Sequence, residues 1–326
     1  MANPLSTKLT EMLKIDHPVM LAGMGGVSYH ALVAAVSEAG GYGCLGASTM
    51  SPDTMVEEMI KVRELTDKPF GVDLLTAMGG DLLRQVDLLI EHGASSFVAG
   101  LGVPEAAVER CHEAGVLVVN MCGKVEHARR AVDAGCDLVV AQGTEAGGHT
   151  GQVATMPLVP LIVNAVGKQI PVVAAGGIFD GRGLAAALAL GAVGVWVGTR
   201  FIASPEARAV IGFKDKMLAS DETDTLVSRA FSGKTMRVLR NDTTAHFEQH
   251  PEELKKFPEQ LGISMNGGYF HLGGDERTAG VDPAREGYPA GQAVGAIDSL
   301  IPAGEIVDLF VREAVEAIGL ASSALR

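Results

Sequence analysis

The chain has 326 residues, of which 47% are hydrophobic and only 5% are aromatic, and its net charge is −13. A chain of this length forms one large α/β barrel or two modest domains, here with a core built mainly of Ala, Val, Leu and Gly. The acidity, without any basic cluster, argues against nucleic acid or an anionic membrane as a partner.

The start of the chain and the cysteines predict the compartment. Residues 1–8 lack an apolar signal segment, and no apolar run reaches transmembrane length. The four cysteines lie in or beside apolar runs and form no C-x-x-C pair. They are Cys44, Cys111, Cys122 and Cys136. We therefore expect reduced core thiols in a soluble, cytoplasmic protein.

From residue 17 onward, a short apolar strand, a Gly-rich or polar loop and an amphipathic helix alternate at intervals of roughly 25 residues. The predicted strands are His17–Leu21, Gly43–Gly46, Phe70–Leu74, Ser96–Gly100, Val116–Asn120, Leu138–Gln142, Pro171–Ala175 and Val193–Gly198. The predicted helices lie near 30–39, 52–66, 81–92, 104–114, 124–135, 157–166 and 181–190. Eight such units are typical of a closed (β/α)8 TIM barrel, and a doubly wound open sheet is the competing architecture.

The period breaks after Thr199. Residues 207–231 have a helical pattern, whereas residues 232–290 are rich in Gly and charged side chains and show little apolar periodicity. A segment of that kind is usually a lid or a binding insertion. Two further helices are expected near 291–301 and 304–321. We predict a barrel of residues 1–206 and 291–326 with closing helices, and a smaller helical lid segment of residues 207–290 over the active site.

One loop carries the candidate chemistry. The stretch from Gln142 to Gly151 follows a predicted buried strand and contains four glycines, with Glu145 and His149 among them. Loops at the carboxyl ends of barrel strands hold the catalytic groups of such folds. His149 is therefore the predicted catalytic residue. Glu145 either holds the loop through backbone N–H groups or is a solvated carboxylate.

A phosphate site is expected after the last two predicted strands. Gly176 and Gly177 follow the seventh strand, and Gly198 and Thr199 follow the eighth. Glycines there leave backbone N–H groups free to bind a phosphate, although they could also serve only as tight turns. No G-x-G-x-x-G motif follows the first strand, so a separate nicotinamide-binding domain is not indicated.

Two other positions could border a flat cofactor ring. Backbone at Gly23 and Met24 could lie along such a ring, with ordinary core packing as the alternative for Met24. Lys124 could place a positive charge at the ring edge, unless it is simply an exposed lysine at a helix start. His246 and His250 have the spacing of two metal ligands, but Pro251 and the surrounding charges indicate an exposed segment, and no metal site is predicted.

Three motifs carry a family resemblance. The loop Gln142–Gly151, the Ala174–Gly177 run with Asp180-Gly181-Arg182-Gly183, and Gly198-Thr199-Arg200-Phe201 resemble the nitronate monooxygenases, formerly called 2-nitropropane dioxygenases. These are FMN-dependent TIM-barrel proteins. The resemblance extends over residues 8–202 and resumes at 290–292. It implies FMN at the carboxyl end of the barrel, contacted by Ala22, Gly23, Met24, Asp73, Lys124, Gln142, Gly147, Gly148, Gly176, Gly177, Gly198, Thr199 and Gln292.

The resemblance implies oxidation of an alkyl nitronate with O2, with His149 facing the substrate. The flavin-dependent enoyl-acyl-carrier-protein reductases have a nearly identical Glu-Ala-Gly-Gly-His loop, and NADH:quinone reductases share the fold and flavin site. A reductase would use NAD(P)H and an enoyl thioester or a quinone. Gln142 replaces an acidic residue of those reductases and favours the monooxygenase. Asp73 stands where the family usually has Asn, and its carboxylate would disfavour an anionic reduced ring unless it is protonated or paired.

Other functions stay open at this point. A non-catalytic flavin- or phosphometabolite-binding barrel would share the glycine motifs, and so would a phosphate-handling isomerase without flavin. The sequence does not give the oligomeric state, and a homodimer stays open.

Overall fold

Residues 5–76, 81–100, 102 and 104–325 are described by the computed structural model. Eight parallel strands form one sheet in the order β1-β9-β8-β6-β5-β4-β3-β2. They are β1 (Val19–Leu21), β2 (Gly43–Gly46), β3 (Phe70–Leu75), β4 (Ser96–Gly100), β5 (Leu117–Cys122), β6 (Leu138–Gln142), β8 (Val172–Ala175) and β9 (Val195–Val197). Each overlaps a predicted strand, and the differences lie at the strand ends.

The sheet is closed into a barrel. A parallel bridge pairs Met20 of β1 with Tyr42, directly before β2. The backbone N–H of Leu21 donates to Tyr42 O, and the N–H of Tyr42 donates to Val19 O, both at 2.9 Å. The two terminal strands of the sheet are thus hydrogen-bonded to each other. The predicted TIM barrel is confirmed, and the open sheet is excluded.

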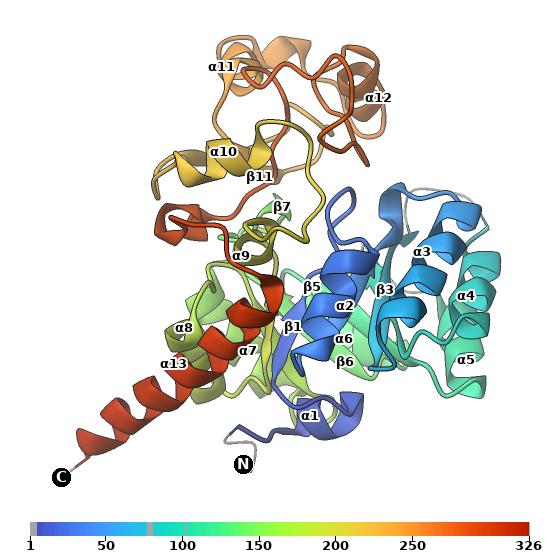
Figure 1. The fold of residues 1–326 in the computed structure, drawn as a ribbon, viewed down its shortest axis with the longest axis vertical. Helices are drawn as coiled ribbons and strands as arrows, with labels where there is room; N and C mark the ends of the chain where they lie inside the picture. Colours follow the sequence, from blue (N-terminus) through green and yellow to red (C-terminus); the bar gives the residue numbers. More distant parts are fainter. Residues whose placement is uncertain (1–4, 77–80, 101, 103, 326) are drawn as a thin grey trace.

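Helices surround the barrel (Figure 1). They are α2 (His30–Glu38), α3 (Pro52–Leu65), α4 (Leu82–Glu91), α5 (Glu105–Glu113), α6 (Val125–Asp133), α7 (Thr155–Val166) and α8 (Gly181–Ala189), with the short η1 (Ala47–Thr49) and α9 (Thr199–Ile202) in the loops. Successive side chains of a strand point to opposite faces of the sheet, so alternate residues pack into two different hydrophobic clusters. Phe97 and Val118 belong to the cluster under the helices, whereas Val98 and Val119 belong to the barrel interior.

Two terminal helices complete the barrel. The first helix, α1 (Lys8–Leu13), buries Leu9 and Leu13 in the interior cluster and covers the end of the barrel opposite residues 207–290 (Figure 1). The last helix, α13 (Ala303–Ser323), packs on α8 so closely that a Cβ on Gly181 would lie 2.3 Å from the backbone N of Ala314. The Glu313 carboxylate also accepts a hydrogen bond from the Gly181 N–H at 3.0 Å.

The prediction for residues 207–290, here called the post-barrel segment, is wrong in detail. Residues 207–231 are not one helix, because only α10 (Phe213–Leu218) is helical and β10 (Thr225–Ser228) follows. Between them, side chains replace the helical hydrogen bonds: Asp221 accepts from the Thr223 N–H at 2.7 Å, and Asp224 accepts from the Asp221 N–H at 2.9 Å.

Residues 232–290 do contain regular elements: β11 (Met236–Leu239), α11 (Asp242–Gln249), η3 (Pro251–Glu253) and α12 (Glu259–Asn266). Their core is a separate hydrophobic cluster in which Phe231 packs against Tyr269 and Phe270. The predicted helix at 291–301 is only the 3-10 turn η4 (Gln292–Ala296). Here Gly295 packs against the backbone of Glu222, where a Cβ would lie 2.3 Å from its N atom.

A small antiparallel sheet, β10-β11-β7, joins the post-barrel segment to the barrel. Its third strand, β7 (Gly148–His149), belongs to the Gly-rich loop after β6 and pairs with Met236 and Arg237 of β11. Figure 1 shows these strands between the barrel and the helices α11 and α12. The four cysteines are free and buried, as predicted. Within the described residues, none of the helices combines the length and the apolar character needed to cross a membrane.

Candidate active site

A cavity of about 970 Å³ lies between the carboxyl ends of the barrel strands and the post-barrel segment. This is a volume typical of a site for a cofactor together with a small ligand. Of the residues predicted for the site, its walls include Ala22, Gly23, Met24, Asp73, Gln142, Gly147, Gly148, His149, Gly176, Gly177, Gly198 and Thr199. The structure therefore brings together predicted residues from five barrel strands (β1, β3, β6, β8 and β9) or the loops that follow them.

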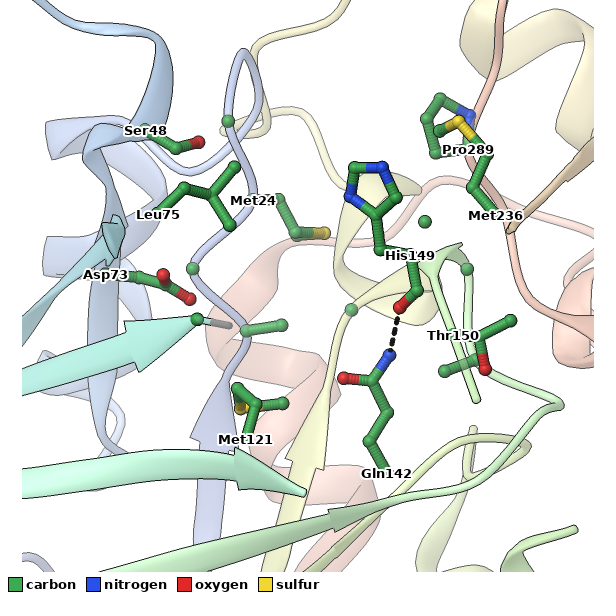
Figure 2. Close-up of a pocket in the computed structure, with 18 of the residues that line it drawn as sticks. Met24, Ser48, Asp73, Leu75, Met121, Gln142, His149, Thr150, Met236 and Pro289 are labelled. Carbon is green, nitrogen blue, oxygen red and sulfur yellow. Dashed lines mark hydrogen bonds between the residues drawn. The ribbon is translucent and has the colours of Figure 1, made fainter. Parts of the chain in front are cut away.

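His149 is held in the cavity wall at three points. Its backbone pairs with Met236 of β11, and its carbonyl oxygen accepts a hydrogen bond from the Gln142 amide at 2.8 Å. Its Nε2 atom lies 2.9 Å from Ser232 Oγ. In Figure 2 the imidazole lies above Gln142, with Met24 on one side of it and Met236 and Pro289 on the other. An imidazole fixed in this way presents one defined face to whatever occupies the cavity.

Burial lowers the pKa of His149, and the nearby Lys234 ammonium lowers it further. Both effects disfavour the charged imidazolium. His149 is therefore neutral at neutral pH and can accept a proton. Lys234 lines the same cavity, and its Nζ also lies 4.2 Å from the centroid of the Phe257 ring.

Glu145 holds the Gly-rich loop, which decides between the two roles considered for it. Its carboxylate accepts hydrogen bonds from the Thr155 N–H at 2.8 Å and from Thr155 Oγ1 at 2.9 Å. Its backbone carbonyl accepts from the Gln292 N–H at 2.9 Å. The buried Arg237 of β11 adds a bond from Nε to Thr144 O at 2.9 Å. The loop is thus fixed from α7, from the end of the chain and from the post-barrel segment.

The predicted phosphate cradle is built of glycines at which a side chain would be strained or crowded. Gly176 and Gly177 have φ angles of +99° and +72°, which L side chains rarely adopt. A Cβ on Gly176 would lie 2.9 Å from Thr155 Oγ1, and a Cβ on Gly198 would lie 3.2 Å from Met24 Sδ. Thr199 Oγ1 accepts a hydrogen bond from the Gly291 N–H at 2.9 Å. These positions fit a phosphate that is bound by backbone N–H groups.

Asp73 is the unusual group of the site. It lies in the cavity wall close to the backbone after β1, where a Cβ on Gly23 would be 2.2 Å from Asp73 Cβ. Among the described residues, no hydrogen bond or ion pair reaches its carboxylate. Burial raises the pKa of Asp73 to about 8. A carboxyl group of this kind is largely protonated at neutral pH and can donate a hydrogen bond.

Two predicted site residues are not in the cavity wall. Lys124 begins α6 as its N-cap, and its exposed ammonium pairs with Glu126 at 2.6 Å. The side chain of Gln292 is exposed, and only its backbone N–H supports the loop. Each side chain turns to solvent from an element whose neighbouring residues line the cavity.

The residues that the post-barrel segment contributes to the cavity wall were not predicted from the sequence. Ser232, Lys234, Met236, His271 and Glu286 all line the cavity. No apolar repeat marks this region, so the pairing of β7 with β11 could not be anticipated. The Ser-Gly-Lys sequence at 232–234 is a turn signal that could have been noted, but its partner His149 lies 83 residues away.

The comparisons with known proteins agree on one family. A family model described as nitronate monooxygenase matches residues 6–82 and 75–313. A relative from Rhodococcus jostii (strain RHA1), named (3aS,4S,5R,7aS)-5-hydroxy-7a-methyl-1-oxo-octahydro-1H-indene-4-carboxyl-CoA dehydrogenase, is 43% identical over 244 residues, which are 75% of this chain and 68% of the relative. A probable nitronate monooxygenase from Staphylococcus saprophyticus subsp. saprophyticus is 34% identical over 302 residues, covering 78% of this chain and 84% of the relative.

Solved structures place the whole chain in the same fold. FabK from Thermotoga maritima superposes with a TM-score of 0.88 at 35% identity, covering 98% of this chain and 100% of that one. This similarity includes the post-barrel segment as well as the barrel. The family match extends over most of the chain and over the His149 loop, the glycine cradle and the barrel strands that carry them. This chain is an enzyme of the nitronate monooxygenase family of flavin-dependent oxidoreductases.

Proposed function

We propose that this protein binds FMN in the cavity and oxidises alkyl nitronates with O2. The observation that carries the proposal is the placement of one neutral, rigidly held imidazole, His149, in the same cavity as the glycine cradle. In this proposal residues 1–206 and 291–326 form the FMN-binding barrel, and residues 207–290 act as a lid.

The residues present fit FMN. Gly176, Gly177, Gly198 and Thr199 would hold its phosphate through backbone N–H groups. The backbone of Ala22, Gly23 and Met24 would lie along the ring, and Gln142 would contact the ring edge. When bound, FMN supplies the electron transfer between the organic substrate and O2. Lys124 and Gln292 have no side-chain part in this proposal, because both side chains lie outside the cavity wall.

One charge in the cavity wall suits an anionic nitronate. Lys234 brings a positive charge to the wall beside His149, and the attraction of an anion to this charge favours binding. A neutral His149 could also take the α-proton of the parent nitroalkane onto its imidazole, since such proton transfer needs a base that is unprotonated at working pH. Gln142, being uncharged, adds no repulsion to an anion.

A second candidate function is the oxidation or reduction of an acyl thioester. It is favoured by the 43% identity to a carboxyl-CoA dehydrogenase and by the similarity to FabK over almost the whole chain. In that reaction His149 would hydrogen bond to the thioester oxygen, on which negative charge develops.

Turnover of a small panel separates these functions. The purified protein, reconstituted with FMN, is assayed for O2 uptake with propionate 3-nitronate and alkyl nitronates, and for NAD(P)H oxidation with crotonyl-CoA and quinones. The proposal predicts O2 uptake with nitronates that does not depend on NAD(P)H. NAD(P)H oxidation with crotonyl-CoA, in the absence of nitronate turnover, would instead establish the second candidate.

A further inference from the structure

A second imidazole, His271, lies in the wall of the same cavity and is paired with a buried carboxylate. The Nδ1 atom of His271 lies 2.6 Å from Glu286 Oε2, and the backbone N–H of His271 donates to Glu286 Oε1 at 2.8 Å. Glu286 is only 1% exposed. Both residues line the cavity and belong to the post-barrel segment, so they are separate from the barrel loops that carry His149.

The hydrogen bonds engage one ring nitrogen of His271 and leave the other without a partner. When the Glu286 carboxylate accepts this hydrogen bond, Nδ1 of His271 carries the proton between the two side chains. Nε2 is left for another partner, and within residues 5–76, 81–100, 102 and 104–325 no hydrogen bond to it occurs. The imidazole is thus oriented by a carboxylate in a residue that lines the cavity, an arrangement common for an imidazole in a catalytic or binding site.

The wall around His271 is firmly held against the barrel. A Cβ on Gly26, in the loop after β1, would lie 3.1 Å from the backbone N of Gly273. Arg208 donates a hydrogen bond to Gly273 O at 2.9 Å and pairs with Asp275 at 3.6 Å. The charged groups that accompany His271 are therefore Glu286 and the Arg208–Asp275 pair. His271 lies in the part of the post-barrel segment that packs on the loop after β1, whereas His149 lies in β7, which pairs with β11.

A purely structural role needs only a hydrogen-bond donor for the second oxygen of Glu286, and that donor need not be an imidazole that lines the cavity. The buried Glu286 carboxylate already receives the His271 backbone N–H, and Glu286 O accepts from the Asn241 amide at 2.6 Å. Burying a carboxylate is costly unless it is paired, so its second oxygen requires a partner. An apolar pair at the two positions would remove that cost and still fill the space. The presence of an ionisable pair in the cavity wall therefore indicates an interaction with the molecule that the cavity binds.

We propose that His271, oriented by Glu286, is a substrate-binding residue whose Nε2 hydrogen bonds to the polar group of the substrate. His149 acts at the reacting carbon, and His271 fixes the substrate from the wall beside Gly26. This inference rests on the proposed function. Glu286 is a positioning residue, because it touches His271 and sets its tautomer.

The test compares H271Q and E286Q with a matched pair of controls. His246 and Glu253 form the same kind of pair, at 2.8 Å, but both are exposed on the post-barrel segment and neither lines the cavity. Both H271Q and E286Q should retain FMN and raise KM for propionate 3-nitronate by roughly 10- to 100-fold, the loss expected for a hydrogen bond to a charged group, with kcat changed far less. The H246Q and E253Q variants should match the wild-type protein in both constants.

A second readout follows the imidazole itself. In protein with 15N-labelled histidine, the His271 signals, assigned through a second variant, H271N, should show an Nδ1–H tautomer. E286Q should alter that tautomer, because the Gln amide has only one accepting oxygen for two N–H groups. Adding propionate 3-nitronate to the FMN-loaded wild-type protein should shift the Nε2 signal. This measurement decides the question even where H271Q fails to fold.

The failures are distinguishable. If the wild-type protein takes up no FMN or does not turn over nitronates, the proposed function is wrong and this inference falls with it. If the wild-type protein is active but H271Q has an unchanged KM, or if the nitronate leaves the Nε2 signal of His271 unmoved, only the role of His271 is overturned.

Discussion

The Nε2 atom of His149 lies 2.9 Å from the hydroxyl oxygen of Ser232, a residue 83 positions later in the chain. Ser232 is itself held by Lys234, whose backbone N–H and carbonyl both lie 3.3 Å from Ser232 Oγ. The hydroxyl can donate either to Lys234 O or to His149 Nε2. The orientation of the predicted catalytic imidazole therefore depends on the post-barrel segment as well as on its own loop.

Replacing Ser232 by Ala should remove one hydrogen bond that orients the His149 imidazole while FMN stays bound. We expect S232A to retain FMN and to lose roughly 2- to 13-fold in kcat/KM for a nitronate, as expected for one lost neutral hydrogen bond. Steady-state kinetics and the flavin absorbance measure the two effects. S323A, an exposed serine near the end of α13, is the control. Equal activity of S232A and wild type would show that the hydroxyl does not orient His149.

Replacing His149 should abolish most of the turnover while leaving cofactor binding intact. H149A is expected to keep the yellow flavin and to lose on the order of 10²- to 10⁴-fold in turnover, the range for a general acid–base residue. Flavin content is read from absorbance and turnover from O2 uptake. Full activity in this variant would remove His149 from the reaction.

The charge of Lys234 should set the pH at which kcat/KM falls on the acid side of its pH profile. Burial and the Lys234 charge both lower the pKa of His149 below its ordinary value, so the neutral imidazole persists as the pH falls below about 6.5. Removing the charge in K234A should raise that pKa and move the acid limb of kcat/KM to higher pH. The exposed Lys256 supplies the control K256A. An acid limb that stays in place in K234A, or moves to lower pH, would contradict this electrostatic coupling.

Asp73 should make the stability of the cofactor-free protein fall as the pH rises. Its pKa is about 8 in the folded protein, above the ordinary value of 3.8, so folding favours the protonated carboxyl. The stabilisation is complete below about pH 4 and is lost progressively as the pH rises through 8. D73N has no such proton to lose, and it should be more stable than wild type at pH 9 by roughly 1–3 kcal/mol.

Thermal unfolding between pH 5 and pH 9 measures this difference. The gap in Tm between D73N and wild type should widen with pH, while D308N, an exposed control on α13, should follow the wild type. A gap that is constant across the pH range would mean that Asp73 is ionised in the folded protein.

The barrel could be predicted from the sequence because its signals are local. Each strand is a short apolar run bounded by glycine or polar residues, and the closing hydrogen bonds between Leu21 and Tyr42 follow from having eight such units. The His149 loop and the glycine cradle were found for the same reason, because glycine at the end of a barrel strand is a strong signal in itself.

The post-barrel segment could not be predicted in the same way. Its core of Phe231, Tyr269 and Phe270 is assembled from turns, so it shows no helical or strand period. The pairing of His149 with Met236 joins residues that are distant in the chain. The direction of the Lys124 side chain could not be predicted either, because at a helix start it depends on the partner, here Glu126.

The glycine cradle offers a substitution that tests FMN binding alone. A side chain at Gly177 would enter the cavity wall at a φ of +72° and lie 3.3 Å from Glu145 Cβ, and a carboxylate there would repel a phosphate. G177D should therefore lose FMN. Gly115, between α5 and β5, has the same φ of +72°, open space around it and no part in the cavity. G115D carries the same backbone strain and should keep FMN.

The most direct measurement is the flavin content of wild type, G177D and G115D after reconstitution with FMN and gel filtration. The account predicts one FMN per chain in the wild type and in G115D, and colourless protein in G177D. A wild-type chain that retains no FMN, or a G177D variant that retains as much as G115D, would contradict the central claim that this cavity is a flavin site.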